Sequence, residues 1–269
     1  MFAFRDGKME STKIAIIGAG NMGGAIAGGL AQGKTISTPN IIVANPSNMK
    51  LEKLKKTYPE IQITNDNKQA ADYADIVILA VKPWKVEEVL RSLDLSSSKV
   101  LVSVAAGITC SELSEFVHPE TAVIRVIPNT AISELASLSL VATQNATDKQ
   151  IEFILKIFNE MGVAMIIEEQ LLPAATSLTS CGIAYVFKYV QAAMLAGIEL
   201  GIKPKDSMKM LAQTLEGAAK ILLNHENTHP AVEIEKVTTP GGVTIKGINT
   251  LEHEGFSSAV IKAIKESAI

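Results

Sequence analysis

Aromatic residues are scarce in this sequence of 269 residues, which contains seven Phe, four Tyr and one Trp. Hydrophobic residues nevertheless make up 47% of the chain, so its apolar content is mostly aliphatic. This composition is typical of packed helices and parallel strands, and it excludes a disordered or fibrous chain. It also indicates that ligands are held by backbone, glycine and hydroxyl groups and not by stacking on aromatic rings.

Cysteine, basic charge and long apolar runs are also in short supply. Cys110 and Cys181 lie far apart without Cys or His at metal-ligand spacing, so neither a disulfide framework nor a metal site is expected. The formal charge of −3 argues against a nucleic-acid partner. The densest apolar run, residues 76–81, is too short to span a bilayer, so no membrane partner is expected. The cysteine usage is typical of a reduced, cytoplasmic protein, and residues 1–10 are too short and too charged for the apolar region of a signal peptide.

Apolar runs of strand length alternate with helical patterns over residues 11–168, the first expected domain. The runs are almost continuous in Ile, Val and Leu, as in strands that helices cover on both faces. The pattern predicts an α/β fold with a doubly wound, Rossmann-type parallel sheet. The expected strands are 13–18, 40–44, 61–64, 75–80, 100–104, 122–127, 138–142 and 163–167, and the expected helices are 21–34, 49–57, 86–92, 111–117 and 148–161.

Helical patterns alone fill residues 169–269, the second expected domain. The segment 171–200 is apolar on most of its circumference, and a helix of this kind must be buried. A helical domain of this size has little interior to bury such a helix, so we expect a homodimer in which these helices pack against the same helices of the second subunit. Further helices are expected from Pro204, over 243–252 and over 257–267, with a polar break at 224–231.

A glycine-rich turn follows the first expected strand and opens the first expected helix. Gly18 suits the tight turn, Gly20 lets the backbone approach a pyrophosphate, and Gly23 lets the helix pack on the strand. The helix N-terminus offers free N–H groups to phosphate. A dinucleotide is therefore expected at this turn, although a purely structural glycine turn is the alternative. The expected cofactor-binding residues here are Gly18, Ala19, Gly20, Asn21, Met22 and Gly23.

The end of the second expected strand discriminates between NADH and NADPH. NAD-binding sheets place Asp or Glu there for the ribose 2′-hydroxyl, but this chain has Asn45 and Ser47, and its first acid is Glu52. A 2′-phosphate would be repelled by an acid and accepted by Asn45, Ser47 and Lys50. We therefore expect NADPH, with NADH possible. The alternative is that these residues only form a turn and a helix cap.

Turns after later strands should line the same crevice, because ligands of open α/β sheets bind at the carboxyl ends of the strands. Small residues at 105–107 would let a flat nicotinamide ring lie against the backbone. Lys82 is equally well explained as a solvated lysine in a turn. The expected cofactor-binding residues of these turns are Ala80, Val81, Lys82, Pro83, Ala105, Gly107 and Asn129.

Together with the segments Val-Thr-Thr-Pro-Gly-Gly-Val-Thr at 237–244 and Leu-Glu-His-Glu-Gly-Phe at 251–256, these turns resemble the pyrroline-5-carboxylate reductase family. The resemblance covers the chain from residue 13 onward. It implies a dinucleotide domain, a helical dimerisation domain and NAD(P)H-dependent reduction of 1-pyrroline-5-carboxylate, a cyclic imine carboxylate, to L-proline. By resemblance Thr244 is the candidate proton donor, in a site completed across the dimer. The substrate-binding residues implied are Val237, Thr238, Thr239, Gly241, Gly242 and Thr244.

Two places depart from the family pattern. Residues 180–185 read Ser-Cys-Gly-Ile-Ala-Tyr where Gly-Ser-Gly-Pro-Ala-Tyr is usual, and Ala131 replaces a proline. The departures leave fine substrate preference open. The alternatives are a reductase of a related cyclic imine or of a hydroxy acid, for which Lys188 is the only candidate lysine in the long helix, and a non-catalytic dinucleotide-binding regulatory protein.

Overall fold

The computed structural model describes residues 11–225 and 228–268. Residues 1–10, for which no signal peptide is expected, and part of the expected polar break at 224–231 lie outside them. Contacts divide the chain into two compact units, one reaching to Ser180 and the other running from Cys181. Residues 169–180 therefore pack with the first unit, whereas the sequence places them in the second domain.

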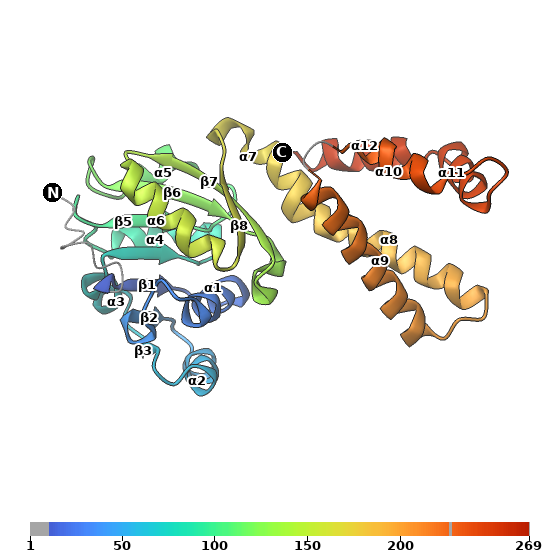
Figure 1. The fold of residues 1–269 in the computed structure, drawn as a ribbon. Coiled ribbons are helices and arrows are strands. Elements are labelled where there is room, and N and C mark those ends of the chain that lie inside the picture. The colour runs from blue at the N-terminus through green and yellow to red at the C-terminus, as the bar shows by residue number, and fades with distance from the viewer. Residues whose placement is uncertain (1–10, 226–227, 269) are drawn as a thin grey trace. The chain divides into compact units, whose positions relative to one another are not determined.

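The first unit contains one eight-stranded sheet (Figure 1). Its spatial order is β3-β2-β1-β4-β5-β6-β7-β8, and each expected strand is found within one or two residues of its expected bounds. The fold class is thus confirmed. The strands are β1 Ile14–Ile17, β2 Ile41–Ala44, β3 Gln62–Thr64, β4 Ile76–Leu79, β5 Val100–Ser103, β6 Ala122–Ile127, β7 Ser137–Gln144 and β8 Gly162–Ile166.

Two strands depart from the all-parallel sheet that the sequence predicts, because β7 runs antiparallel to β6 and β8 runs parallel to β7. Only residues 128–136 connect these strands, and they contain the short 3-10 helix Thr130–Glu134. A crossover to a parallel neighbour needs a dozen or more residues, so this connection can only reverse the chain. The other six pairings are parallel, including β7 with β8.

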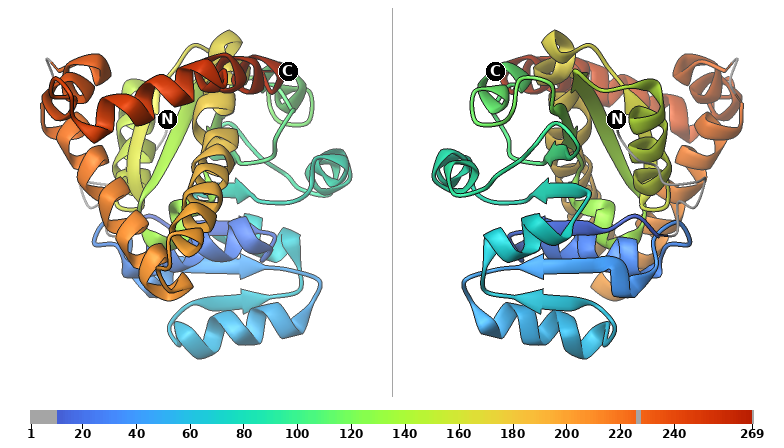
Figure 2. Two further views of the ribbon diagram at one scale, coloured as in Figure 1. Left: turned by 90° about the vertical axis from the view of Figure 1, so that its right-hand side faces the viewer. Right: turned by 90° about the vertical axis from the view of Figure 1, so that its left-hand side faces the viewer.

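Helices cover both faces of the sheet, as two separate apolar cores show. In β1, Ile14 and Ile16 point to one core and Ala15 and Ile17 to the other, because successive side chains alternate across a strand. The first core includes residues of α1 Asn21–Gln32, α2 Asn48–Thr57 and α6 Asp148–Asn159. The second includes residues of α3 Asn67–Tyr73, α4 Val86–Arg91 and α5 Cys110–Ser114. Figure 2 shows the neighbouring blue strands β1 and β2 from two sides.

Helix α3 is absent from the sequence prediction. It is only seven residues long and has no extended apolar stripe, which explains why periodicity does not reveal it. Its beginning is nevertheless well defined, because the Asp66 carboxylate accepts hydrogen bonds from the N–H groups of Lys68 (2.8 Å) and Gln69 (3.1 Å).

The segment predicted as one helix over 171–200 is helical but not regular. It comprises the 3-10 turn Glu169–Leu171, α7 Leu172–Thr176, a π-helical turn at Ser177–Cys181 and α8 Gly182–Glu199. The π-helical turn overlaps the segment that departs from the family pattern at Ser180 and Cys181. The remaining helices are α9 Pro204–Asn224, α10 Pro230–Val237, α11 Val243–His253 and α12 Phe256–Glu266, of which α10 begins inside the expected polar break.

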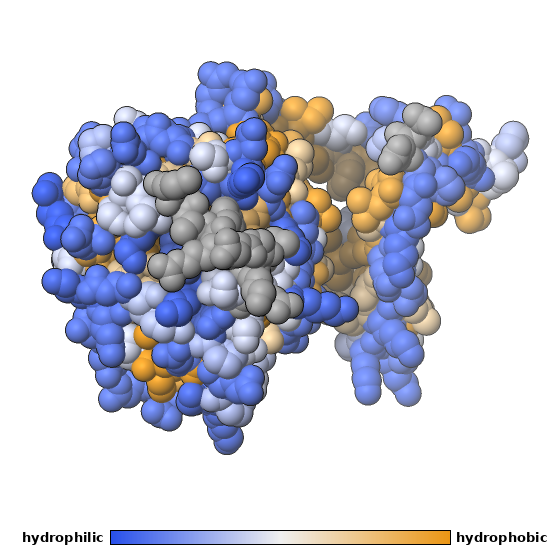
Figure 3. Space-filling model, turned by 60° about the vertical axis from the view of Figure 1, so that its left-hand side comes forward, coloured by the Kyte–Doolittle hydropathy of each residue, from blue (hydrophilic) through white to orange (hydrophobic). Residues whose placement is uncertain are grey.

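The second unit exposes many large apolar side chains, and Figure 3 shows hydrophobic residues on the surface of its helices. Phe187 is 62% exposed and Leu195 is 59% exposed. By length and composition alone, the helical segment Glu169–Glu199 could cross a membrane, and only 11% of its most apolar window is buried within the chain. Exposed apolar faces of this kind are typical of surfaces that contact another protein or a membrane.

Candidate active site

The carboxyl ends of the central strands lie at one edge of the sheet. The order of the strands reverses at β1, whose neighbours are β2 and β4, so the crevice above it is a topological switch point. The turns expected to bind the cofactor therefore follow neighbouring strands. Backbone hydrogen bonds align these ends: Gly18 N to Ala44 O (2.8 Å), Ala80 N to Ile17 O (2.8 Å) and Val104 N to Leu79 O (3.0 Å).

The glycine turn has a shape that side chains at two of its positions would not allow. Gly18 has φ +106°, and a Cβ there would lie 2.5 Å from the Ala80 carbonyl oxygen. A Cβ on Gly23 would lie 1.9 Å from the Gly18 carbonyl oxygen. A Cβ on Gly20 would meet no atom within 4 Å, so the space above this residue is open. These are the features that a dinucleotide pyrophosphate needs.

Helix α1 offers its first N–H groups to this open space. Gly20 is its N-cap residue, and no side chain caps the helix. The positive end of the helix dipole and its N–H groups therefore face the position of the expected pyrophosphate. The residues present fit a dinucleotide at this turn.

Asn45 joins the glycine turn to the end of β2. Its side chain is buried, its amide oxygen accepts a hydrogen bond from Ala19 N–H (3.0 Å), and its amide nitrogen donates to the Ser47 carbonyl oxygen (3.2 Å). Asn65 donates to the Asn45 carbonyl oxygen (2.9 Å). Asn45 thus supports the turn, and its expected contact with a 2′-phosphate stays a prediction. Ser47 is exposed and precedes α2 as its N-cap residue.

A cavity of about 560 Å³ opens between the start of α1 and helix α2. Its lining includes three of the expected cofactor residues, Lys50, which is expected near the 2′-phosphate, and also Lys53, which is not among the residues expected from the sequence. Lys53 follows Lys50 by three residues, so a helical pattern of lysines on one face was the available signal. The lining residues are Ala19, Gly20, Asn21, Gly24, Met49, Lys50, Lys53, Leu54 and Thr57.

The later turns occupy the expected edge of the sheet. Lys82 is exposed and precedes the 3-10 helix Pro83–Lys85, while Val81 is half-buried. Ala105 is buried, and Gly107 has φ +76° with open space around its Cα. The Asn129 side chain accepts a hydrogen bond from Ala131 N–H (3.0 Å), which a proline at position 131 could not donate. The departure at Ala131 therefore permits a local cap.

An ion pair between a buried arginine and a half-buried glutamate lies on the α5 side of the sheet. Arg125 of β6, whose side chain is 8% exposed, donates through Nη1 to Glu169 Oε1 (2.6 Å). The same carboxylate oxygen accepts from Cys110 N–H (2.7 Å). Burial opposes ionisation of Glu169, but the hydrogen bonds from Arg125 and Cys110 hold its pKa below the ordinary value. Burial, together with the Glu169 charge, raises the pKa of Cys110 to about 12, so this cysteine is a neutral thiol and no nucleophile.

The loop that the family resemblance assigns to the substrate lies entirely in the second unit. Thr238 follows α10 and donates through its hydroxyl to the Ile234 carbonyl oxygen (3.0 Å). Gly241 has φ +75°, and Gly242 donates its N–H to the Thr239 carbonyl oxygen (3.0 Å) and is the N-cap residue of α11. Val237, Thr239 and Thr244 are exposed. The loop therefore presents two hydroxyl groups at the N-terminus of a helix that no side chain caps.

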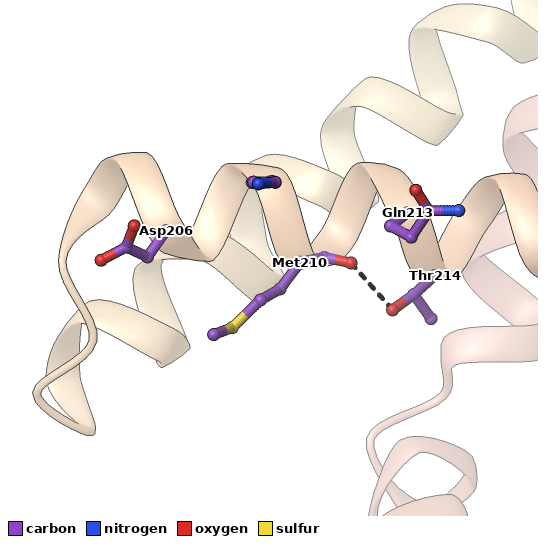
Figure 4. A pocket seen from close by; sticks show the side chains of 5 residues that line it. Asp206, Met210, Gln213 and Thr214 are labelled. Atoms are coloured by element: carbon purple, nitrogen blue, oxygen red, sulfur yellow. Dashed lines mark hydrogen bonds between the residues drawn. The ribbon is translucent and has the colours of Figure 1, made fainter.

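A second cavity, of about 550 Å³, lies along α9, and its lining residues include Asp206, Met210, Gln213 and Thr214 (Figure 4). The Thr214 hydroxyl donates to the Met210 carbonyl oxygen within the same helix (2.9 Å). All residues that line this cavity lie on one side of α9, so it has neither a phosphate-binding turn nor polar groups that converge from several elements. It is therefore not the candidate site. Among residues 11–225 and 228–268, no three His, Cys, Asp or Glu side chains are placed to hold a metal ion.

The strand order, the switch-point crevice and the glycine turn define a Rossmann-type dinucleotide-binding protein. Residues 13–107 match the family described as NADP oxidoreductase, coenzyme F420-dependent, and residues 169–269 match the one described as pyrroline-5-carboxylate reductase dimerisation. The chain belongs to the pyrroline-5-carboxylate reductase family, as near full-length relatives show.

Two relatives come from Dictyostelium discoideum. Pyrroline-5-carboxylate reductase 2 is 37% identical over 96% of this chain and 92% of its own length. Pyrroline-5-carboxylate reductase 1 is 34% identical over 97% of this chain, which spans only 49% of that longer protein. The crystal structure of Plasmodium falciparum pyrroline carboxylate reductase with NADP bound has a TM-score of 0.86 and 27% identity, with 97% of each chain covered.

Proposed function

We propose that this chain is a pyrroline-5-carboxylate reductase that uses NADPH to convert 1-pyrroline-5-carboxylate into L-proline. The observation that carries the proposal is the combination of near full-length family membership with a glycine turn shaped for a pyrophosphate. The NADP-bound structure of the Plasmodium falciparum relative supports the choice of cofactor. When bound, the reduced nicotinamide supplies a hydride to the imine carbon, and the imine nitrogen gains a proton.

The protein itself has to bind the cofactor, orient the substrate and provide a proton for the imine nitrogen. The turn at Gly18–Gly23 and the N-terminus of α1 hold the pyrophosphate. The loop at Thr239–Thr244 and the N-terminus of α11 suit the substrate carboxylate, because unpaired N–H groups and the helix dipole favour an anion. The Thr244 hydroxyl is the proposed proton donor to nitrogen. A basic imine nitrogen needs no stronger acid.

We also propose a cytoplasmic homodimer whose subunits together complete the substrate site. The match of residues 169–269 to a dimerisation family and the exposed apolar faces of α8 and α9 support this assembly. The free thiols of Cys110 and Cys181 are compatible with a reducing compartment.

The direct test measures NADPH oxidation by the purified full chain with 1-pyrroline-5-carboxylate, related cyclic imines and the 2-oxo acids that correspond to hydroxy-acid products. We expect turnover with 1-pyrroline-5-carboxylate at the highest kcat/KM. Faster turnover of another imine or of an oxo acid would transfer the proposal to that substrate class. Tight NADPH binding without any turnover would identify a non-catalytic binding protein instead.

The role of Thr244 is tested by Thr244→Ala. We expect kcat to fall by about 100-fold, because general acid catalysis is lost, while the Kd for NADPH stays unchanged. Thr250→Ala is a matched control on the same helix, since the Thr250 hydroxyl is exposed and donates only to the Lys246 carbonyl oxygen. An unchanged kcat in Thr244→Ala would remove this hydroxyl from the chemistry.

A further inference from the structure

The cavity between α1 and α2 has two unlike walls. Gly20 and Gly24 form the α1 wall, where an added Cβ would meet no atom within 4 Å. Helix α2 forms the opposite wall with Lys50 and Lys53, and within the described chain lysine is the only charged residue type that lines the cavity. The cavity is therefore open on the side of the phosphate-binding turn and positively charged on the other.

Among residues 11–225 and 228–268, neither Lys50 nor Lys53 has an ionic partner. Lys55 of the same helix, in contrast, donates through Nζ to the Ile61 carbonyl oxygen (2.7 Å). Lys50 and Lys53 thus keep their ammonium groups for a ligand, whereas Lys55 serves the fold.

The position of these lysines relative to β2 indicates which group of the ligand they meet. In Rossmann-type sheets the ribose 2′ position lies at the end of the second strand, which is Ala44 here. Side chains of a helix lean toward its N-terminus, and α2 begins just after this strand end. Lys50 lies in the first turn of α2 and Lys53 in the second, both on the side that lines the cavity, so this general lean is directed toward the strand end.

Asn45 carries no charge, its side chain is buried, and one of its two amide N–H groups already donates to the Ser47 carbonyl oxygen, so it offers a phosphate at most one neutral hydrogen bond. We propose that Lys53, assisted by Lys50, binds the 2′-phosphate of NADPH and sets the preference for NADPH over NADH. This inference rests on the proposed function, since it assumes that the glycine turn binds a nicotinamide dinucleotide. It adds Lys53 to Lys50, which the sequence already indicates for the 2′-phosphate, and makes Lys53 the main determinant of cofactor selectivity.

The experiment measures the Kd of NADPH and NADH by calorimetry for wild type, Lys53→Gln, Lys50→Gln and the double variant. Glutamine keeps most of the side-chain length and removes only the charge. For Lys53→Gln we expect NADPH binding to weaken by about 10- to 100-fold, as for a lost charge-assisted hydrogen bond, and NADH binding to change by less than about twofold. The double variant should lose most of the discrimination.

Lys56→Gln is the matched control, because Lys56 is exposed on the same helix and does not line the cavity. Its Kd values should equal those of wild type. Unchanged NADPH binding in the double variant, or equal losses for NADPH and NADH, would overturn the assignment while wild-type turnover of the imine upheld the proposed function. Failure of the wild-type protein to bind either dinucleotide would overturn both.

Discussion

Gly23→Ala is expected to destroy the cofactor site. The new methyl group would lie 1.9 Å from the Gly18 carbonyl oxygen and 3.0 Å from the Ala80 Cβ, so helix α1 must move away from the strand ends. Overpacking of this kind costs about 3 kcal/mol in the free energy of unfolding. Because the displaced atoms form the phosphate-binding turn, we also expect the Kd for NADPH to rise by at least about 100-fold. Denaturant unfolding and calorimetric titration measure the two effects.

Gly24→Ala separates the clash from the general effect of changing a helix glycine. This residue is the next one along α1, and its added Cβ would meet no atom within 4 Å. Alanine has the higher helix propensity, so unfolding should become harder by about 0.5–1 kcal/mol. If Gly23→Ala had the same free energy of unfolding as wild type, this result would contradict the close approach of α1 to the turn at Gly18.

Glu169→Ala is expected to destabilise the first unit by about 2 kcal/mol. The substitution leaves the Arg125 guanidinium, whose side chain is 8% exposed, without its carboxylate partner. Loss of one partner from a buried ion pair costs about 3–5 kcal/mol, and the 35% exposure of the Glu169 side chain reduces that cost. Denaturant unfolding monitored by far-UV circular dichroism measures the change.

The double variant Arg125→Met/Glu169→Leu is the control for this pair. It removes both charges together and fills the space with apolar atoms, so it should be more stable than Glu169→Ala. A double variant less stable than the single one would show that Arg125 is held by other groups.

The contribution of Glu169 to the free energy of unfolding should also depend on pH. The pKa of Glu169 is lower in the folded chain than its ordinary value of 4.5, so the folded state favours the ionised carboxylate. This stabilisation is complete above the unfolded pKa and is lost as the pH falls through the folded pKa. The stability difference between wild type and Glu169→Gln should therefore be constant near neutral pH and shrink below about pH 4.5.

Much of the fold follows from local pattern. Runs such as Ile14–Ile17 and Ile76–Leu79 are apolar throughout because helices bury both faces of these strands, and the sequence alone predicts them. The prediction of a parallel β7 was wrong, although the short connection before it was a signal against a crossover. Helix α3 could not be predicted from the sequence, because its seven residues carry a cap but no long periodic pattern.

The candidate site likewise has features that the sequence predicts and others that only the tertiary structure reveals. The sequence by itself determined the glycine turn, because its spacing between strand and helix encodes a local backbone shape. Only the tertiary structure decided that the Asn45 amide supports that turn, that Lys53 lines the cavity and that Arg125 meets Glu169. Each of these contacts joins residues from different elements, and such pairings depend on how strands and helices pack, which no local period records.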